Sequence, residues 1–125
     1  MRKATRILLL GLAVWALPFA LGMALFPVLD PATALFDTLM SVAMALSATL
    51  FAAIHLSRCS VPSFDEGLLA GSIWLVMSVA LDTPFFIFGP AEMRMAPADY
   101  LADIGLTYFM IPIIAASIGY AMKRA

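Results

Sequence analysis

The chain carries very little charge. Only 12% of its 125 residues are Asp, Glu, Lys or Arg, while 64% are hydrophobic, against ~45–50% in soluble domains. A chain this apolar could not hide its surface in one water-soluble core, so we expect lipid to be its solvent. The net charge of −1 and the lack of a basic run outside the termini argue against a nucleic-acid partner.

Cysteine and histidine each occur once, as Cys59 and His55. A single cysteine excludes an intramolecular disulfide and the paired cysteines of membrane thiol oxidoreductases. Cys59 and His55 could meet near one end of a predicted span, although such a pair at a helix end is more often incidental. The nine methionines raise copper as an alternative, but methionine is also a routine packing residue. We therefore expect no metal, no catalytic residue and no cofactor.

Four long apolar stretches predict membrane-spanning helices at residues 7–29, 31–56, 67–89 and 97–122. The first stretch exceeds the ~7–15-residue core of a signal peptide, which favours a retained span over the competing interpretation, a cleaved signal. Asp30 and Pro31 predict an N-cap followed by proline at the first helical position of the second span. The predicted fold is one all-α domain over residues 1–125, a four-helix transmembrane bundle.

The basic residues predict the orientation. If the N-terminus is cytoplasmic, only Arg94 lies outside, which satisfies the positive-inside rule. We therefore expect a multi-pass protein of the inner (plasma) membrane with both termini in the cytoplasm. The residues placed inside are Arg2, Lys3, Arg6, Arg58, Lys123 and Arg124.

The two halves of the chain match each other. A shift of 60 residues aligns the first predicted span with the third, and a shift of 66 aligns the second with the fourth. The pattern predicts a tandem repeat of two helical hairpins, related by a pseudo-two-fold axis along the membrane normal. Small residues such as Gly67 and Gly71 allow close helix packing and make a homodimer a candidate assembly. The second shift places Pro31, Asp37, Ser41 and Met44 on Pro97, Asp103, Thr107 and Met110.

Three aspartates fall at one predicted depth. Asp82 lies seven residues before Gly89, roughly 10 Å from the predicted outer surface. Asp37 and Asp103 each lie six residues after a proline at the start of a predicted span, which places them at a similar depth below the same surface. Acids at this depth are costly, so the sequence predicts that they bind a proton or a small cation. An alternative is structural, because the helix dipole stabilises acids in the first turns. The predicted lining is Thr83, Thr107, Ser41 and Tyr108.

The segments DEGLLAGSIWLVMSVALDTP and DYLADIGLTYFMIP resemble a group of small four-span proteins of bacteria and archaea that carry no assigned activity. The resemblance covers about half of the chain and implies a four-span fold without implying a function. Small multidrug-resistance transporters have a similar size, but they place an essential glutamate in the first span. The first span here has no acid, which argues against membership.

The leading functional expectation is a proton- or cation-coupled carrier or channel-like subunit, homo-oligomeric in the bilayer, with an outer-facing acidic site. The alternative is a non-transporting accessory, assembly or sensor protein whose acids anchor helices or a partner. An intramembrane enzyme is the weakest expectation, because no nucleophile–base pair is visible in the sequence.

Overall fold

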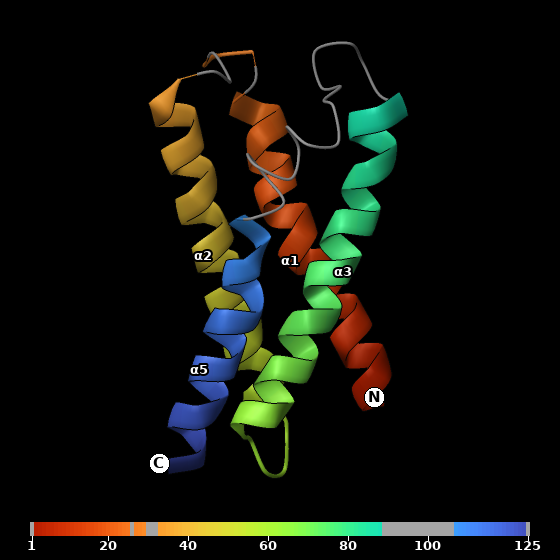
Figure 1. The fold of residues 1–125 in the computed structure, drawn as a ribbon, viewed down its shortest axis with the longest axis vertical. Helices are drawn as coiled ribbons and strands as arrows, with labels where there is room; N and C mark the ends of the chain where they lie inside the picture. Colours follow the sequence, from red (N-terminus) through yellow and green to blue (C-terminus); the bar gives the residue numbers. More distant parts are fainter. Residues whose placement is uncertain (1, 26, 30–32, 89–106, 125) are drawn as a thin grey trace.

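All regular structure in the described part of the chain is helical. The computed structural model describes residues 2–25, 27–29, 33–88 and 107–124. Its elements, shown in Figure 1, are α1 (Lys3–Leu25), α2 (Ala34–Ser57), α3 (Phe64–Phe88), the short 3₁₀ helix η2 (Thr107–Phe109) and α5 (Met110–Arg124). Helices α1, α2 and α3 are long and apolar enough to cross a membrane. The all-helical fold expected from the sequence is therefore confirmed for the described residues, and the length and composition of three helices are consistent with a membrane protein.

The fourth predicted span is described only in part. Helix α5 has 15 residues and is about 22 Å long at ~1.5 Å per residue, which is shorter than the ~30 Å hydrocarbon core of a bilayer. Residues 97–106, the first part of the predicted span, lie outside the described residues. The described helices thus show three candidate spans, and a fourth stays a prediction.

Local chemistry moves two helix boundaries from their predicted places. Helix α1 ends at Leu25, before residue 29, because Pro27 cannot donate a helical hydrogen bond; the amides of Val28 and Leu29 instead close a turn on the Leu25 carbonyl. Helix α2 is capped by Thr33, whose Oγ1 accepts a bond from the Phe36 amide at 3.3 Å. The predicted cap residues Asp30 and Pro31 lie outside the described residues.

Helix α3 begins at Phe64, three residues before the predicted start at Gly67. The cause is Ser63, whose Oγ accepts a hydrogen bond from the Glu66 amide at 3.2 Å. Serine followed three residues later by glutamate is the capping-box pattern of helix N-termini. This earlier start places the Glu66 carboxylate on the first turn of a helix, where it faces the neighbouring elements.

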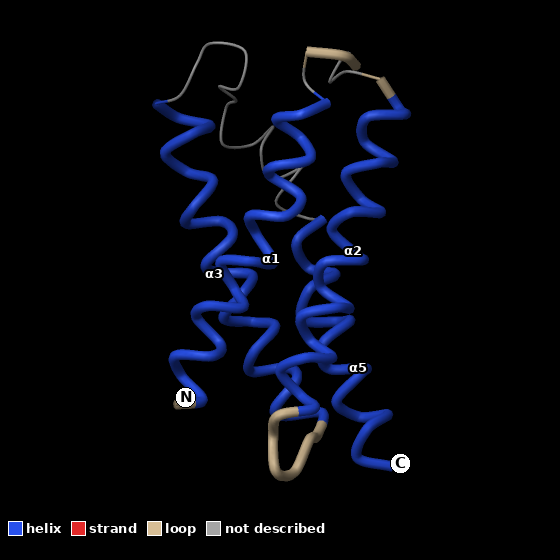
Figure 2. The backbone as a smooth tube through the Cα atoms, turned by 180° about the vertical axis from the view of Figure 1, so that it is seen from behind, coloured by secondary structure: helices blue, strands red, loops and turns tan. Residues whose placement is uncertain are grey.

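Each of the four described α-helices packs mainly against two of the others. Helix α1 packs against α2 and α3, and α5 packs against α3 and α2; the arrangement is visible from both sides (Figures 1 and 2). The start of α1, the end of α5 and the α2–α3 turn lie at the same end of the bundle (Figure 1). A two-fold axis along the membrane normal would instead place α1 beside α5. The described packing therefore does not confirm the predicted repeat axis.

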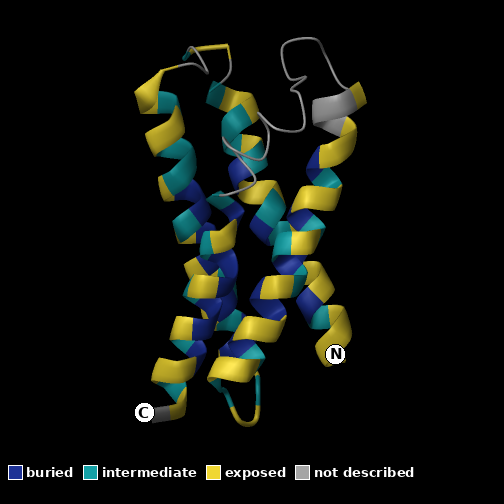
Figure 3. Cartoon of the chain, viewed as in Figure 1, coloured by how far each residue is buried: buried dark blue, intermediate teal, exposed yellow. Residues whose placement is uncertain are grey.

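The burial pattern is that of a protein surrounded by lipid. Large apolar side chains such as Leu46 and Val76 are 64% and 67% exposed, and exposed residues cover the outer faces of all the long helices (Figure 3). The residues buried between the helices include four polar ones, Ser47, His55, Ser78 and Asp82. In a bilayer the exposed apolar groups face hydrocarbon, while polar groups must find their partners inside the bundle.

A proline in α1 is compensated by a serine in α2. Pro18 has no N–H, so the carbonyl of Val14 loses its helical donor. The hydroxyl of Ser47 donates to this carbonyl at 3.1 Å, and both residues are fully buried. Pro18 is therefore tolerated inside α1 because the neighbouring helix supplies the missing donor.

Glycines let α3 approach α5 closely. A Cβ placed on Gly67 would lie 2.1 Å from the Ala115 carbonyl oxygen, and one on Gly71 would lie 2.4 Å from the Cα of Pro112. The backbones of the two helices are therefore in direct contact at these positions. The small residues noted in the sequence as a candidate dimer surface are used here within a single chain.

We expect Ser47→Ala to lower the unfolding free energy by about 1 kcal/mol, because it leaves the Val14 carbonyl without a donor. In a Pro18→Ala background the new Ala amide can donate to Val14, so the same serine substitution should cost close to nothing. Unfolding in detergent micelles measures both costs. Ser117→Ala is the control, because Ser117 is exposed and bonds the Ile113 carbonyl of its own helix. Equal costs in the two backgrounds would contradict the compensation.

We expect Gly67→Ala to destabilise the protein by about 1–3 kcal/mol, because the added methyl group meets backbone atoms that cannot move without separating α3 from α5. Gly22→Ala is the matched control, since its Cβ would meet only the flexible side chain of Met40, with the nearest atom at 3.2 Å. Thermal unfolding of both variants in the same detergent makes the comparison. An equal loss in both would show that the α3–α5 contact is not the cause.

Candidate functional sites

Asp82 is a buried carboxylate that joins three elements. It is 1% exposed and belongs to α3. The indole Nε1 of Trp15 in α1 donates to Asp82 Oδ1 at 2.7 Å, and the hydroxyl of Tyr108 in η2 donates to Oδ2. Each oxygen of the carboxylate thus accepts a hydrogen bond, and the two donors come from elements far apart in the sequence.

A second tryptophan keeps Trp15 and Asp82 at the same level. Trp74 of α3 is fully buried and its Nε1 donates to the Ile7 carbonyl of α1 at 2.8 Å. Both bonds join residues 67 positions apart, so they hold the parallel helices α1 and α3 in one register. Trp15 is further oriented by stacking on Phe19, with ring centroids 4.6 Å apart.

The structure brings together some of the residues predicted to form an acidic site. Asp82 and Tyr108 are in direct contact, whereas Asp37 is exposed in the first turn of α2. Thr83 is exposed and its hydroxyl bonds the Val79 carbonyl of its own helix at 2.8 Å. Ser41 and Thr107 are half-buried, and Asp103 lies outside the described residues. The meeting of the three aspartates remains a prediction.

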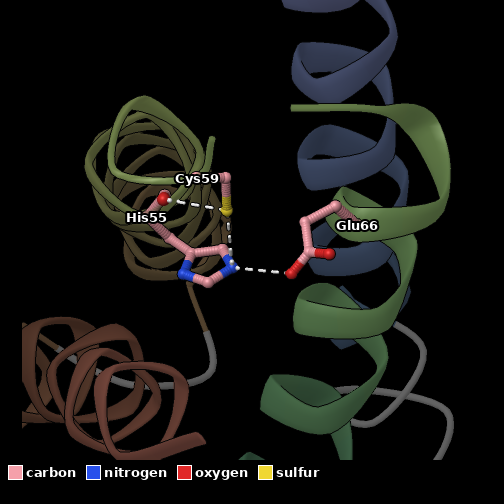
Figure 4. A group of neighbouring side chains, drawn as sticks. All are labelled: His55, Cys59 and Glu66. Carbon is pink, nitrogen blue, oxygen red and sulfur yellow. Dashed lines mark hydrogen bonds and ion pairs between the residues drawn. The ribbon is translucent and has the colours of Figure 1, made fainter. Parts of the chain in front are cut away.

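A second polar cluster lies at the opposite end of α3. It contains Lys3 and Arg6 of α1, His55 of α2, Cys59 of the α2–α3 turn and Glu66 of α3. The side chains of His55, Cys59 and Glu66 point toward one another (Figure 4). The imidazole of His55 is fully buried at the centre of the cluster, and its ring lies edge-on to that of Trp74.

The contacts of His55 are divided between its two nitrogens. Nδ1 accepts a hydrogen bond from Arg6 Nε at 3.1 Å. Nε2 lies 3.7 Å from Cys59 Sγ and 3.5 Å from Glu66 Oε1. Lys3 Nζ lies 3.1 Å from both carboxylate oxygens of Glu66, but this ion pair is half exposed on the lysine side and adds little stability.

The surroundings of Cys59 favour the thiol over the thiolate, because they raise its pKa. Burial raises the pKa of the Cys59 thiol, and the negative charge of Glu66 raises it further, while Arg6 and Lys3 lower it to a smaller extent. The Arg6 Nη2 atom lies 3.7 Å from Sγ. Because the thiolate is the reactive nucleophile, this cysteine is poorly suited to nucleophilic catalysis.

The geometry also differs from that of a catalytic triad. In a triad the nucleophile and the carboxylate contact different nitrogens of the histidine. Here Cys59 and Glu66 both approach Nε2, and the other nitrogen accepts from a cation. An arrangement in which nitrogen, sulfur and oxygen atoms face one common point is the one that a metal ion uses.

The sequence contains signals for this cluster. His55 and Cys59 are four residues apart, a spacing that would place them on one face if the helix continued; in the structure α2 ends at Ser57 and Cys59 lies in the turn that follows. Glu66 lies just before the predicted third span at residues 67–89, so the apolar pattern alone does not assign it to a helix. The capping-box pattern of Ser63 and Glu66 is the signal that places this carboxylate at a helix start beside the α2–α3 turn.

In comparisons with known proteins, no protein-family model matches the chain, and no curated protein or solved structure matches it.

We expect the rate of Cys59 alkylation to rise with pH around a midpoint that is higher than the midpoint for an ordinary cysteine, because the pKa of the Cys59 thiol is raised. In Glu66→Gln the midpoint of the pH–rate profile should fall, because a negative charge near Sγ is lost. In Arg6→Gln it should rise, because a positive charge is lost. Alkylation by iodoacetamide in detergent with EDTA provides the profile.

Asp65→Asn is the control for the alkylation profile. It removes the same charge as Glu66→Gln, but from the exposed neighbouring position, so it should leave the midpoint close to that of the wild type. Midpoints that do not separate, or that move in the opposite directions, would contradict the electrostatic account of the thiol.

Proposed function

We propose that the protein is a small membrane carrier or channel-like subunit in which a proton exchanges at Asp82. The observation that carries the proposal is the contact of one buried carboxylate with both Trp15 and Tyr108. An ionisable residue placed inside a membrane-spanning bundle is costly and is most often retained for ion or proton binding.

The two donors differ in what they can do when a proton arrives. An indole N–H can only donate, whereas a phenolic hydroxyl can donate or accept. When a proton sits on Asp82 Oδ2, the Tyr108 hydroxyl can turn to accept a hydrogen bond from it. Trp15 holds Oδ1 in place throughout. We therefore propose Tyr108 as a group through which a proton reaches or leaves the carboxylate.

We further propose that the chain crosses the membrane four times, with both termini in the cytoplasm of a bacterial-type inner membrane. The positive-inside rule supports this orientation, since the basic residues Arg2, Lys3, Arg6 and Arg58 all lie at or near the end of the bundle that holds the termini. Asp82 is then nearer the outer side. The proposed tandem repeat, and a small cation as an alternative to the proton, rest on the sequence pattern alone.

A pH jump across proteoliposomes tests the proton-exchange site. We expect Asp82→Asn to abolish protein-dependent proton flux. Its amide oxygen can still accept from Trp15 and its NH₂ can donate to Tyr108, so the fold should survive. Tyr108→Phe should slow the flux by about 10²-fold, the lower end of the contribution of a positioned proton-transfer group.

Thr83→Val is the control for the flux measurement, because Thr83 is the exposed neighbour of Asp82 and bonds only its own helix in the described contacts. It should keep wild-type flux. Wild-type flux in both Asp82→Asn and Tyr108→Phe would rule out the proposed exchange.

The second candidate is an accessory or sensor protein in which Asp82 only anchors helices. It is favoured by the fact that Asp82 links α3 to α1 and η2. On this account wild-type protein shows no flux above empty liposomes, and substitution of Asp82 with alanine lowers the unfolding temperature or releases a partner. The same proteoliposome series therefore separates the two candidates.

A further inference from the structure

We propose that His55, Cys59 and Glu66 form a binding site for a divalent transition-metal ion, with Zn²⁺ as the ion whose ligand preferences fit best. This site lies at the end of the bundle that holds the termini and does not depend on proton exchange at Asp82. The donor atoms are His55 Nε2, Cys59 Sγ and a carboxylate oxygen of Glu66, all within 4.8 Å of one another.

The separations match the edges of a zinc coordination tetrahedron. Zinc binds nitrogen and oxygen at ~2.0–2.2 Å and sulfur at ~2.3 Å, so neighbouring ligand atoms lie about 3.3–3.8 Å apart. His55 Nε2 lies 3.5 Å from Glu66 Oε1 and 3.7 Å from Cys59 Sγ. Two of the three edges therefore already have the required length, and the donor atoms converge as drawn in Figure 4.

The donor set selects the class of metal. One imidazole, one thiolate and one carboxylate suit a borderline ion such as Zn²⁺, whereas Mg²⁺ and Ca²⁺ prefer oxygen ligands alone. The positions of the ligands are well defined, because His55 is fully buried in α2 and Glu66 is fixed by the start of α3. Three protein ligands leave the fourth position for water or for a further ligand.

Two cations, Arg6 and Lys3, lie beside this site. Arg6 donates to His55 Nδ1 and contacts Cys59, while Lys3 pairs with Glu66. A metal-bound imidazole carries its proton on the other nitrogen and donates it to an acceptor. Arg6 offers a donor there, so its side chain must turn away when the metal binds. The thiol proton of Cys59 leaves to solvent at the same time.

Metal binding therefore competes with the contacts that tie the start of α1 to the cluster. In the structure Lys3 and Arg6 connect α1 to α2, α3 and the turn between them. With metal bound, α2 and α3 are linked through the ion instead. A variant that removes the Arg6 cation should bind metal more tightly, which a purely structural ion-pair cluster would not do.

Cobalt titration of untagged, EDTA-treated protein in detergent tests the site. We expect Co²⁺ to produce the near-ultraviolet charge-transfer absorption of a cobalt–thiolate bond, and Zn²⁺ to remove it by displacement. Cys59→Ser should lose this absorption. Glu66→Gln should weaken Zn²⁺ binding at least about tenfold, and Arg6→Gln, whose amide oxygen can accept from Nδ1, should strengthen it by about tenfold.

Asp65→Asn is the matched control for Glu66→Gln and should bind as the wild type does. Unfolding temperatures of all variants without metal identify any that fail to fold. Arg6→Gln keeps all three ligands, so its tighter binding is expected even if Glu66→Gln is unstable. The proposal is overturned if wild-type protein shows no cobalt–thiolate absorption, or if Arg6→Gln binds more weakly than wild type.

Discussion

Hydrocarbon surroundings penalise any polar group that lacks a partner inside the protein, and this constraint organises the bundle. The Val14 carbonyl freed by Pro18 takes a donor from Ser47 in α2. The Ile7 carbonyl of α1 accepts a hydrogen bond from Trp74 of α3, and Trp15 of α1 donates a hydrogen bond to Asp82 of α3. Each of these bonds joins α1 to a neighbour. The groups that are most costly to leave unpaired are therefore the ones that place the first helix.

The two ends of the bundle hold different chemistry. The Asp82 end combines a carboxylate with an indole, which can only donate a hydrogen bond, and a phenol, which can donate or accept one. The opposite end combines a histidine, a cysteine and a glutamate with the two cations Lys3 and Arg6. On our proposal, a metal ion would compete there with these two side chains. Helices α1 and α3 contribute to both ends, so their packing connects the two sites physically.

Composition was sufficient to predict helices suited to a membrane, and apolar stretches located the three candidate spans to within a few residues. The boundaries depended on single residues that a hydrophobicity pattern does not weigh, Pro27 at the end of α1 and Ser63 at the start of α3. Asp82 could be singled out because an acid in an apolar run is rare. Its bond to Trp15 could not, because it depends on how α1 and α3 are aligned. Local patterns place His55, Cys59 and Glu66 near the α2–α3 turn, but the contacts of this cluster with Lys3 and Arg6 of α1 depend on how the helices pack.

The two tryptophan bonds share a 67-residue separation, so the number of residues between the two bonds must be the same in α1 as in α3. Ile7 and Trp15 are eight residues apart, as are Trp74 and Asp82. Inserting or deleting one residue between Ile7 and Trp15 would turn the indole by about 100° around α1. Only a matching change between Trp74 and Asp82 would restore both bonds. The two stretches therefore form a matched pair of spacers, and we expect their lengths to change together or not at all.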